Sequence, residues 1–229
     1  MNINLTPRLL AAARKVDKGE RIADIGTDHG YVPIYLILSG VAGRAIACDI
    51  NEGPLMRAYE NIKKYDLCDK IELRLSDGFS NIGKDEADTA LILGMGGLLI
   101  ARILDNSRHT GIDTFILQPM QAQSKLREYL YNNNFVILDE ELAMEGDKIY
   151  TIIKAVRGTP KKVEKVYYHI GEKLIENRDP LLPLLLDRKI NEYEKIIKGQ
   201  ETGRGKADSD VYELLKGFKK IKDRMERWY

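Results

Sequence analysis

Acidic residues and glycines gather where two apolar stretches of the sequence end. Asp24, Gly26 and Asp28 lie where the first stretch turns, and Asp49 closes the second, 23 positions after Gly26. Glycine lets the backbone approach a ligand closely, and a carboxylate at the end of a second strand can accept hydrogen bonds from both hydroxyls of a ribose. This spacing therefore predicts a site for an adenosine-containing cofactor.

The glycine turn itself separates two classes of cofactor. A dinucleotide site needs the pattern G-x-G-x-x-G, so that a pyrophosphate can sit on a helix N-terminus. Here the pattern is Gly26-x-x-x-Gly30, with Asp28 and His29 between the glycines. A carboxylate facing the cofactor would repel a pyrophosphate but attract a ligand with an ammonium and a sulfonium group. The turn therefore favours S-adenosylmethionine (SAM), and NAD is the less favoured alternative.

The expected cofactor-binding residues lie at the ends of the first four predicted strands. They are Asp24, Gly26, Thr27, Asp28, Gly30, Tyr31, Asp49, Ile50, Asn51, Ser76, Asp77, Gly78, Gly94 and Gly96. The carboxylate of Asp77 could accept the exocyclic amino group of the adenine ring. The alternative for 76–78 is a simple turn, because Asp-Gly is a common turn pair.

Gly94-Met95-Gly96-Gly97 ends the fourth predicted strand, where the methyl group of the cofactor would face a substrate. Methyltransferases of exocyclic amines usually carry an acidic or amide residue, two prolines and an aromatic residue here, and this motif is absent. Three glycines would instead let a planar base approach the backbone. The alternative is that Gly96 and Gly97 only begin a helix against the sheet.

Two more polar residues are expected near this rim. Gln118 follows the fifth predicted strand, and its amide could both donate to and accept from a base edge. Thr6 and Pro7 have the character of a helix start, with Thr6 as the N-cap and Pro7 at the first helical position. Arg8 would then lie near the mouth of the site.

Composition predicts a globular protein with no metal site. The 229 residues are 44% hydrophobic and 31% charged, and no run of about 20 apolar residues could span a membrane. The N-terminus lacks the pattern of a secretory signal, so a cytoplasmic location is expected. Cys48, Cys68 and three scattered histidines show no metal-ligand spacing. Residues 159–229 hold 17 Lys and Arg against 13 Asp and Glu, so any basic face belongs to this segment.

Apolar stretches alternate with amphipathic ones up to about residue 157. They predict strands near 21–25, 44–49, 70–75, 89–94, 113–118, 135–142 and 148–156, and helices near 31–40, 52–65, 96–106 and 121–133, with a poorly defined crossover at 79–86. Such β-α repetition predicts a parallel sheet with right-handed crossovers. The last two strands are separated only by a turn at Gly146 and Asp147, so they should form an antiparallel hairpin. The predicted fold is thus the α/β, Rossmann-like sheet of class I methyltransferases.

A break at 157–160 divides the chain into a sheet domain, 1–158, and an all-α coiled-coil domain, 159–229. Apolar residues then recur at helical spacing in three segments, which the 199–205 stretch and Asp179-Pro180 should separate. The last segment has a heptad seam, made of Val211, Leu214, Phe218, Ile221, Met225 and Trp228. The opposite faces carry Lys161, Lys162, Lys165, Lys219, Lys220, Lys222, Arg224 and Arg227, which could follow RNA phosphates or be a solvated face.

The chain resembles the bacterial tRNA (adenine-22-N1)-methyltransferases over its whole length. The resemblance is carried by Thr6 to Leu9, Asp24 to Pro33 (DIGTDHGYVP), Asp49 to Leu55 (DINEGPL), Gly94 to Gly97 (GMGG), Leu117 to Pro119 and Lys148 to Tyr150. It implies a SAM-binding Rossmann-like domain followed by a helical domain that helps to hold tRNA.

The chemistry that this resemblance implies assigns five candidate catalytic residues, Arg8, Asp28, His29, Gly94 and Met95. N1 of adenine has an in-plane lone pair and can attack the methyl group without prior deprotonation. The product is cationic, so Asp28 would stabilise it while His29 orients the adenine or the acid.

The same residues are also compatible with other functions. The chain could methylate a protein or a small molecule, or be a non-catalytic SAM-binding module that recruits a partner. A monomer is expected, and a dimer through the C-terminal helices is the alternative.

Overall fold

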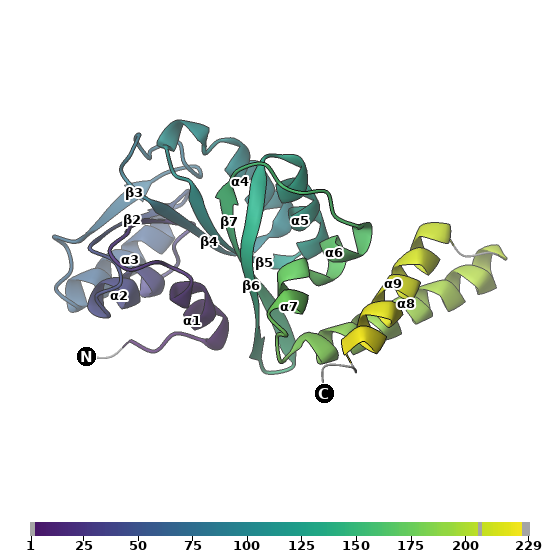
Figure 1. Ribbon diagram of the computed structural model, residues 1–229. Coiled ribbons are helices and arrows are strands. Elements are labelled where there is room, and N and C mark those ends of the chain that lie inside the picture. Colours follow the sequence, from purple (N-terminus) through teal and green to yellow (C-terminus); the bar gives the residue numbers. More distant parts are fainter. Residues whose placement is uncertain (1–2, 206–207, 226–229) are drawn as a thin grey trace. The chain divides into compact units, whose positions relative to one another are not determined.

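The computed structural model describes residues 3–205 and 208–225 and divides into two compact units, shown in Figure 1. The first unit ends at Lys161 and the second begins at Lys162. Each unit has its own set of elements, and they are treated separately below.

A seven-stranded sheet forms the centre of the first unit (Figure 1). Its strands are β1 (Arg21–Ile25), β2 (Arg44–Asp49), β3 (Ile71–Leu75), β4 (Thr89–Gly96), β5 (Thr114–Gln121), β6 (Phe135–Glu145) and β7 (Lys148–Arg157). Their order is β3-β2-β1-β4-β5-β7-β6, in which β1 to β5 pair in parallel and β7 is antiparallel to both β5 and β6. The predicted parallel sheet with its closing antiparallel hairpin is confirmed.

Helices cover both faces of the sheet. They are α1 (Pro7–Arg14), α2 (Tyr31–Leu38), α3 (Glu52–Lys64), α4 (Gly97–Asp105) and α5 (Gln123–Asn132), with a short 3-10 turn η1 (Arg108–Thr110). Because side chains of a strand alternate between faces, Ile22 of β1 packs with α1 to α3, while Ala23 and Ile25 pack with α4 and α5. Both faces of β1 are therefore covered, as expected for a central strand of a parallel sheet.

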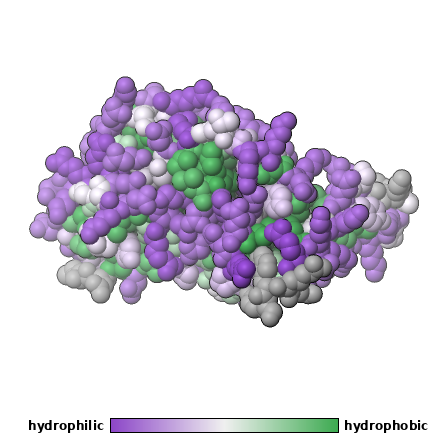
Figure 2. Space-filling view, in the orientation of Figure 1, coloured by the Kyte–Doolittle hydropathy of each residue, from purple (hydrophilic) through white to green (hydrophobic). Residues whose placement is uncertain are grey.

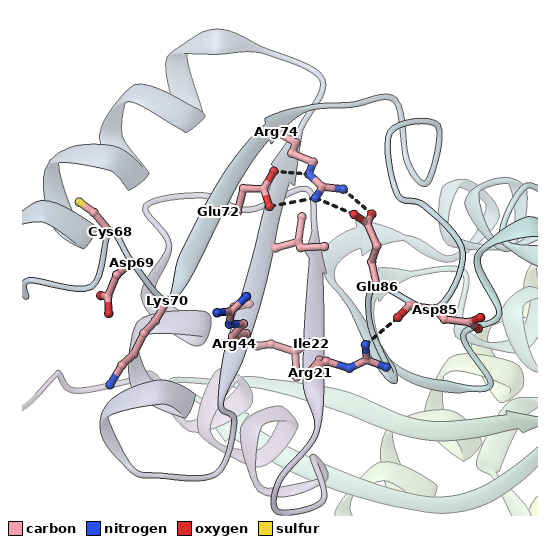
Figure 3. Close-up of a pocket in the computed structure, with 12 residues that line it drawn as sticks. Arg21, Ile22, Arg44, Cys68, Asp69, Lys70, Glu72, Arg74, Asp85 and Glu86 are labelled. Carbon is pink, nitrogen blue, oxygen red and sulfur yellow. Dashed lines mark hydrogen bonds and ion pairs between the residues drawn. The ribbon is translucent and has the colours of Figure 1, made fainter.

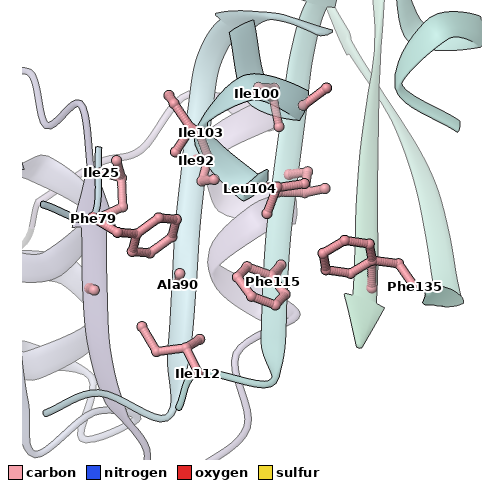
Figure 4. Packing of buried hydrophobic residues seen from close by; sticks show 14 of the residues in the cluster. Ile25, Phe79, Ala90, Ile92, Ile100, Ile103, Leu104, Ile112, Phe115 and Phe135 are labelled. Atoms are coloured by element: carbon pink, nitrogen blue, oxygen red, sulfur yellow. The ribbon is translucent and has the colours of Figure 1, made fainter. Parts of the chain in front are cut away.

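Three phenylalanines, Phe79, Phe115 and Phe135, belong to the core that also contains Ile100, Ile103 and Leu104 of α4 (Figure 4). The ring of Phe115 packs edge-on against Phe79 and Phe135, with centroids 6.3 Å and 5.5 Å apart. Hydrophilic residues cover most of the molecular face in Figure 2, and the apolar side chains that remain visible form smaller patches.

The crossover between β3 and β4 contains no helix. Residues 76–88 form turns instead, anchored by the buried side chains of Phe79 and Ile82. Beside this loop lies a pocket of about 500 Å³, here called the crossover pocket, bordered by the first residues of β1 and β2 (Figure 3). Within it Arg74 bridges Glu72 and Glu86, with N–O distances of 2.7 Å and 2.5 Å.

The second unit consists of α6 (Lys165–Ile170), α7 (Glu172–Glu176), α8 (Leu182–Arg204) and α9 (Ser209–Met225). The prediction of one continuous first helix was wrong, because Gly171 has a φ of +89° and separates α6 from α7. The prediction that the break between two helices begins at residue 199 was also wrong. The helix α8 continues through Gly199 and ends only at Arg204.

An aromatic cluster joins three helices of the second unit. The rings of His169, Tyr193 and Phe218 pack at steep angles, with centroids 5.0 to 6.0 Å apart. From the predicted heptad seam, Phe218, Ile221 and Met225 are buried, whereas Val211 and Leu214 are half-buried. Trp228 and Arg227 lie outside the described residues. The buried part of the seam packs within this chain, since α8 and α9 lie against each other.

Candidate active site

A cavity of about 410 Å³ opens at the carboxyl ends of β1 and β4, and it is here called the rim cavity. Its lining consists of Thr6, Arg8, Leu9, Asp24, Gly26, Asp28, His29, Tyr31, Val32, Leu93, Gly94 and Met95. All five candidate catalytic residues lie in this lining. Thr27, Gly30, Gly96, Asp49 to Asn51 and Ser76 to Gly78 lie outside it, at neighbouring turns and strand ends.

The glycine turn after β1 is held against β2. The amide groups of Gly26 and Thr27 both donate to the carbonyl oxygen of Cys48, at 2.8 Å and 2.7 Å. Gly26 has a φ of +77°, which other residues rarely adopt, and a Cβ atom there would lie 1.9 Å from Cε of Met95. The turn therefore requires glycine for its conformation, whereas the flexible end of the Met95 side chain could move away from a Cβ atom.

A buried carboxylate lies beneath this turn. Asp24 is only 6% exposed, and burial raises its pKa to about 6. The nearby Asp49 carboxylate adds to the rise, while the side chain of Thr27 opposes it. Two carboxylates in a poorly solvated place favour a positively charged ligand, because it would offset both the desolvation and their mutual repulsion.

The second acidic residue of the turn is exposed and already has a cationic neighbour. Asp28 Oδ1 lies 3.0 Å from Nη2 of Arg57 in α3 and 3.6 Å from Nε2 of His29. His29 has a φ of +63°, and its ring stacks on Tyr31 with centroids 5.1 Å apart. The sequence did not indicate this role of Arg57, because nothing in the pattern of α3 marks its single arginine as a partner of the turn.

Arg8 is fixed at the cavity by residues from two distant parts of the chain. Its Nη1 donates to Oε1 of Gln118 at 3.0 Å, and its backbone amide donates to Oε1 of Glu145 at 2.9 Å. Its guanidinium also lies 5.6 Å from the ring centroid of Tyr150. Partial burial alone would raise the pKa of Glu145, but hydrogen bonds from Thr6 and Arg8 hold it below its ordinary value.

Gln118 does not face a substrate, so its predicted role in reading a base edge is wrong. Its side chain is completely buried, and its oxygen also accepts the backbone amide of Gly94 at 3.2 Å. Its nitrogen donates to the carbonyl oxygen of Pro119 at 3.1 Å. Gln118 therefore connects Arg8 to the end of β4 rather than contacting a ligand.

The four residues 94–97 divide between two roles. Pairing of β4 with β5 is irregular on both sides of Met95, so the end of β4 bends away from regular strand geometry beside the cavity. At Gly97 a Cβ atom would lie 2.5 Å from the carbonyl oxygen of Ala122. Gly97 is thus required where α4 begins against the turn that precedes α5, while Gly94 and Met95 line the cavity.

The ends of β2 and β3 extend the site along the sheet edge. The amide of Asn51 donates to Oδ1 of Asp49 at 2.7 Å, and the amide of Ser76 donates to the carbonyl oxygen of Asp49 at 2.9 Å. Ile50 is 60% exposed next to them, and Asp77 is exposed at the following turn. A polar ligand that leaves the rim cavity along this edge would meet Asp49, Ile50 and Asp77 in that order.

Several cations of the second unit are already paired. Lys165 lies 2.9 Å from Asp210, Lys219 lies 2.6 Å from Glu194, and Lys222 lies 2.6 Å from Asp187. Within the described ranges 3–205 and 208–225, no group of acidic, His or Cys side chains could hold a metal ion. The described helices likewise include none that is long and apolar enough to cross a membrane.

Comparisons with known proteins agree with this arrangement. Residues 5–153 match the family described as methyltransferase domain. The tRNA (adenine(22)-N(1))-methyltransferase of Bacillus subtilis is 39% identical over 158 residues, which are 68% of this chain and 66% of that protein. A putative tRNA methyltransferase of Mycoplasma genitalium is 30% identical over 69% of this chain and 72% of its own length.

The fold extends the similarity over nearly the whole chain. A crystal structure of a putative tRNA (m1A22) methyltransferase from Streptococcus pneumoniae, in complex with S-adenosyl-L-methionine, superposes with a TM-score of 0.84. It is 27% identical, and the superposition covers 96% of this chain and all of that one, 100%.

Proposed function

This chain belongs to the methyltransferase-domain family and, within it, to the SAM-dependent tRNA (adenine-22-N1)-methyltransferases, and we propose that it methylates N1 of adenine 22 in tRNA. The observation that carries the proposal is the rim cavity itself. It combines the buried carboxylate of Asp24, the glycine turn at Gly26 and the bent end of β4 in one place. This combination suits a cationic cofactor beside a planar substrate.

The residues along the sheet edge could contact each part of SAM in turn. Asp24 would bind its ammonium group, Asp49 its ribose hydroxyls and Asp77 its adenine amino group, with the exposed Ile50 against the ring. When bound, SAM supplies an electrophilic methyl group on a positively charged sulfur. The chain need not provide that chemistry, and its own work is to hold and orient the two reactants.

Methyl transfer to N1 requires alignment of the two reactants more than it requires acid–base catalysis. N1 of adenine attacks with its in-plane lone pair, so no proton has to be removed first. The rim cavity would hold the ring between the end of β4 and the turn after β1, with water excluded by Met95 and Leu93. The methylated ring is cationic, and the carboxylate of Asp28 in the lining favours that charge.

Arg8 is proposed as the fixed cation of the site. Its guanidinium forms an ion pair with Glu145, with Nε 3.3 Å from Oε2, and a hydrogen bond to Gln118. It therefore loses little freedom when an anionic group of a bound reactant reaches it. Because N1 lies on the Watson–Crick edge, the target adenine must leave its base pair or stack before it can enter.

The second unit is proposed to bind the body of the tRNA. Lys162, Lys220 and Arg224 are exposed, and they would contact backbone phosphates. Such contacts would help to offset the few kcal/mol that extruding a base costs.

Methyl transfer to a defined tRNA tests the proposal directly. Radiolabelled SAM is incubated with an unmodified tRNA transcript that has adenine at position 22, and the nucleosides are identified by mass spectrometry. The matched control transcript carries guanine at position 22. We expect 1-methyladenosine only with the first transcript. Labelling of neither transcript, together with labelling of protein or small molecules in an RNase-treated extract, would contradict it.

A further inference from the structure

A second hollow lies next to the rim cavity at the same edge of the sheet. It has a volume of about 360 Å³ and is here called the flanking hollow; its lining is Gly96, Gly97, Leu98, Leu99, Arg102, Gln121 and Ala122. The two hollows share no lining residue, but their linings are adjacent along the chain where β4 ends and α4 begins. Gly94 and Met95 line the rim cavity, and the next two residues line the flanking hollow.

Two leucines give the flanking hollow one apolar wall, and both are exposed to solvent. Leu98 is 64% exposed and Leu99 is 44% exposed, both in the first turn of α4. Met120, which precedes Gln121 at the end of β5, is 41% exposed. Large apolar side chains concentrated at one edge, beside an active site, are typical of a binding surface rather than of scattered exposed residues.

The two hollows differ in charge. The lining of the rim cavity has the carboxylates of Asp24 and Asp28 against the single arginine Arg8. The flanking hollow has Arg102, and no acidic side chain occurs among its described lining residues. The first is therefore suited to a cationic cofactor, and the second to a ligand that combines an apolar surface with a negative charge.

A nucleotide is such a ligand, since its base is a flat apolar surface and its phosphate is anionic. Two residues of a strand cover about 6.6 Å, at about 3.3 Å each. Neighbouring nucleotides are only about 3.4 Å apart along a stacked helix, but they lie farther apart where the strand is extended around an extruded base. A nucleotide adjoining the one in the rim cavity can therefore reach the flanking hollow.

We propose that the flanking hollow binds the tRNA nucleotide adjoining the methylated adenosine, an inference that rests on the proposed function. Its base lies on Leu98 and Leu99, and its phosphate pairs with the guanidinium of Arg102. The side-chain amide of Gln121 is exposed at the edge and hydrogen-bonds the sugar or the base. This subsite fixes the register of the RNA strand, so that only one nucleotide can enter the rim cavity.

The full-length protein with Arg102→Ala tests the phosphate contact, with Arg44→Ala as the matched control. Arg44 is also an exposed arginine, but it begins β2 at the opposite edge of the sheet, and its loss changes the net charge equally. We expect Arg102→Ala to weaken tRNA binding about tenfold and to reduce the slope of log affinity against log salt by about one. Arg102→Lys should restore most of the binding, and the dissociation constant of SAM should stay unchanged in all variants.

Leu98→Ala tests the apolar wall, with Leu38→Ala as its control. Leu38 is an exposed leucine, 44% accessible, at the end of α2. We expect the KM for tRNA to rise about threefold to tenfold for Leu98→Ala alone, with kcat within a factor of about two.

Two results would overturn the inference. Equal effects of Arg102→Ala and Arg44→Ala would mean that only the net charge matters. A fall in kcat with unchanged tRNA affinity would mean that the hollow holds the reacting base and not its neighbour. Both are distinct from failure of the proposed function, in which the unaltered protein forms no 1-methyladenosine in the same tRNA.

Discussion

The rim cavity and the crossover pocket lie at opposite edges of one sheet, and the larger of them is not the candidate site. The crossover pocket measures about 500 Å³ and the rim cavity about 410 Å³. In the crossover pocket charges neutralise one another, and the Arg74 guanidinium lowers the pKa of Glu86 to about 2. In the rim cavity burial raises the pKa of Asp24 to about 6 instead.

The difference shows that a buried charge without a countercharge, rather than a large volume, distinguishes the binding site in this fold. A carboxylate held by two hydrogen bonds from an arginine gains little from a further ligand. A buried carboxylate without a cation beside it is costly until a cationic group arrives. The comparison can be tested by altering one edge of the sheet and using the other edge as the control.

Replacement of Asp24 should have the largest effect. We expect Asp24→Asn to weaken SAM binding by about 3 kcal/mol, because the ammonium group loses a buried countercharge. Glu86→Gln in the crossover pocket should leave SAM binding unchanged. Isothermal titration calorimetry measures the SAM affinity of both variants. Equal affinities for Asp24→Asn and the unaltered protein would show that Asp24 does not contribute to SAM binding.

The same substitution should stabilise the free protein. A carboxyl whose folded pKa lies above its unfolded value retains its proton to higher pH in the folded state. Its contribution to stability is therefore favourable or neutral below about pH 4 and becomes a cost as the pH rises through about 6. At pH 7 we expect Asp24→Asn to raise the free energy of unfolding by about 2 kcal/mol, and to raise it little at pH 4, as measured by urea denaturation.

Gly26→Ala should have the next largest effect. The substitution would force an L-residue into a φ of +77° and would displace the flexible end of the Met95 side chain. We expect a loss of about 2 kcal/mol in SAM affinity, with lower thermal stability. Gly43→Ala is the control, because a Cβ there meets no atom within 4 Å and Gly43 has an ordinary φ. If both variants bind SAM like the unaltered protein, the turn does not contact the cofactor.

Asp28→Asn should affect turnover more than binding. Asp28 is exposed and already paired with Arg57, so its contribution to SAM binding is small. Its charge can still favour the cationic product, and we expect kcat to fall about tenfold with little change in the dissociation constant of SAM. Asp69→Asn at the crossover pocket is the control. An equal loss of affinity and rate would identify Asp28 as a cofactor-binding residue alone.

The smallest effect is expected from Glu145→Gln. The glutamine keeps an oxygen for the Arg8 amide but loses the negative charge, so kcat/KM should fall about threefold. Because the folded pKa of Glu145 is lowered, its stabilising contribution is present at neutral pH and is lost as the pH falls below about 4. Thermal melts of the two proteins should therefore converge at low pH, and a constant difference would exclude this ion pair as the cause.

The architecture of the first unit could be predicted from local patterns. The apolar runs of β1 and β2, the turn at Gly26 and the hairpin around Gly146 depend on residues adjacent in the chain, and all appear near their predicted positions. The position of Asp49 after β2 follows in the same way, because parallel strands present their carboxyl ends at one edge. The spacing of apolar residues, the residues of a turn and the direction of successive strands are local properties, so the sequence determines them.

Prediction from pattern was less successful in the helical unit. Glycine weakens a helix by about 1 kcal/mol, which favours a break near Gly199. The structure continues α8 past Gly199 and Gly203, where contacts with α9 outweigh that preference. The break occurs instead at Gly171, whose φ of +89° no local pattern indicated.

The sequence by itself determined the sheet, the glycine turn and the acidic residues at the strand ends. Only the tertiary structure decided which side chains remain available to a ligand. Glu145 meets Arg8 across 137 positions of the chain, and Gln118 is enclosed by the same network. Arg57 reaches Asp28 from another helix. These pairings depend on strand order and on the packing of distant segments, and neither is encoded in the spacing of neighbouring residues.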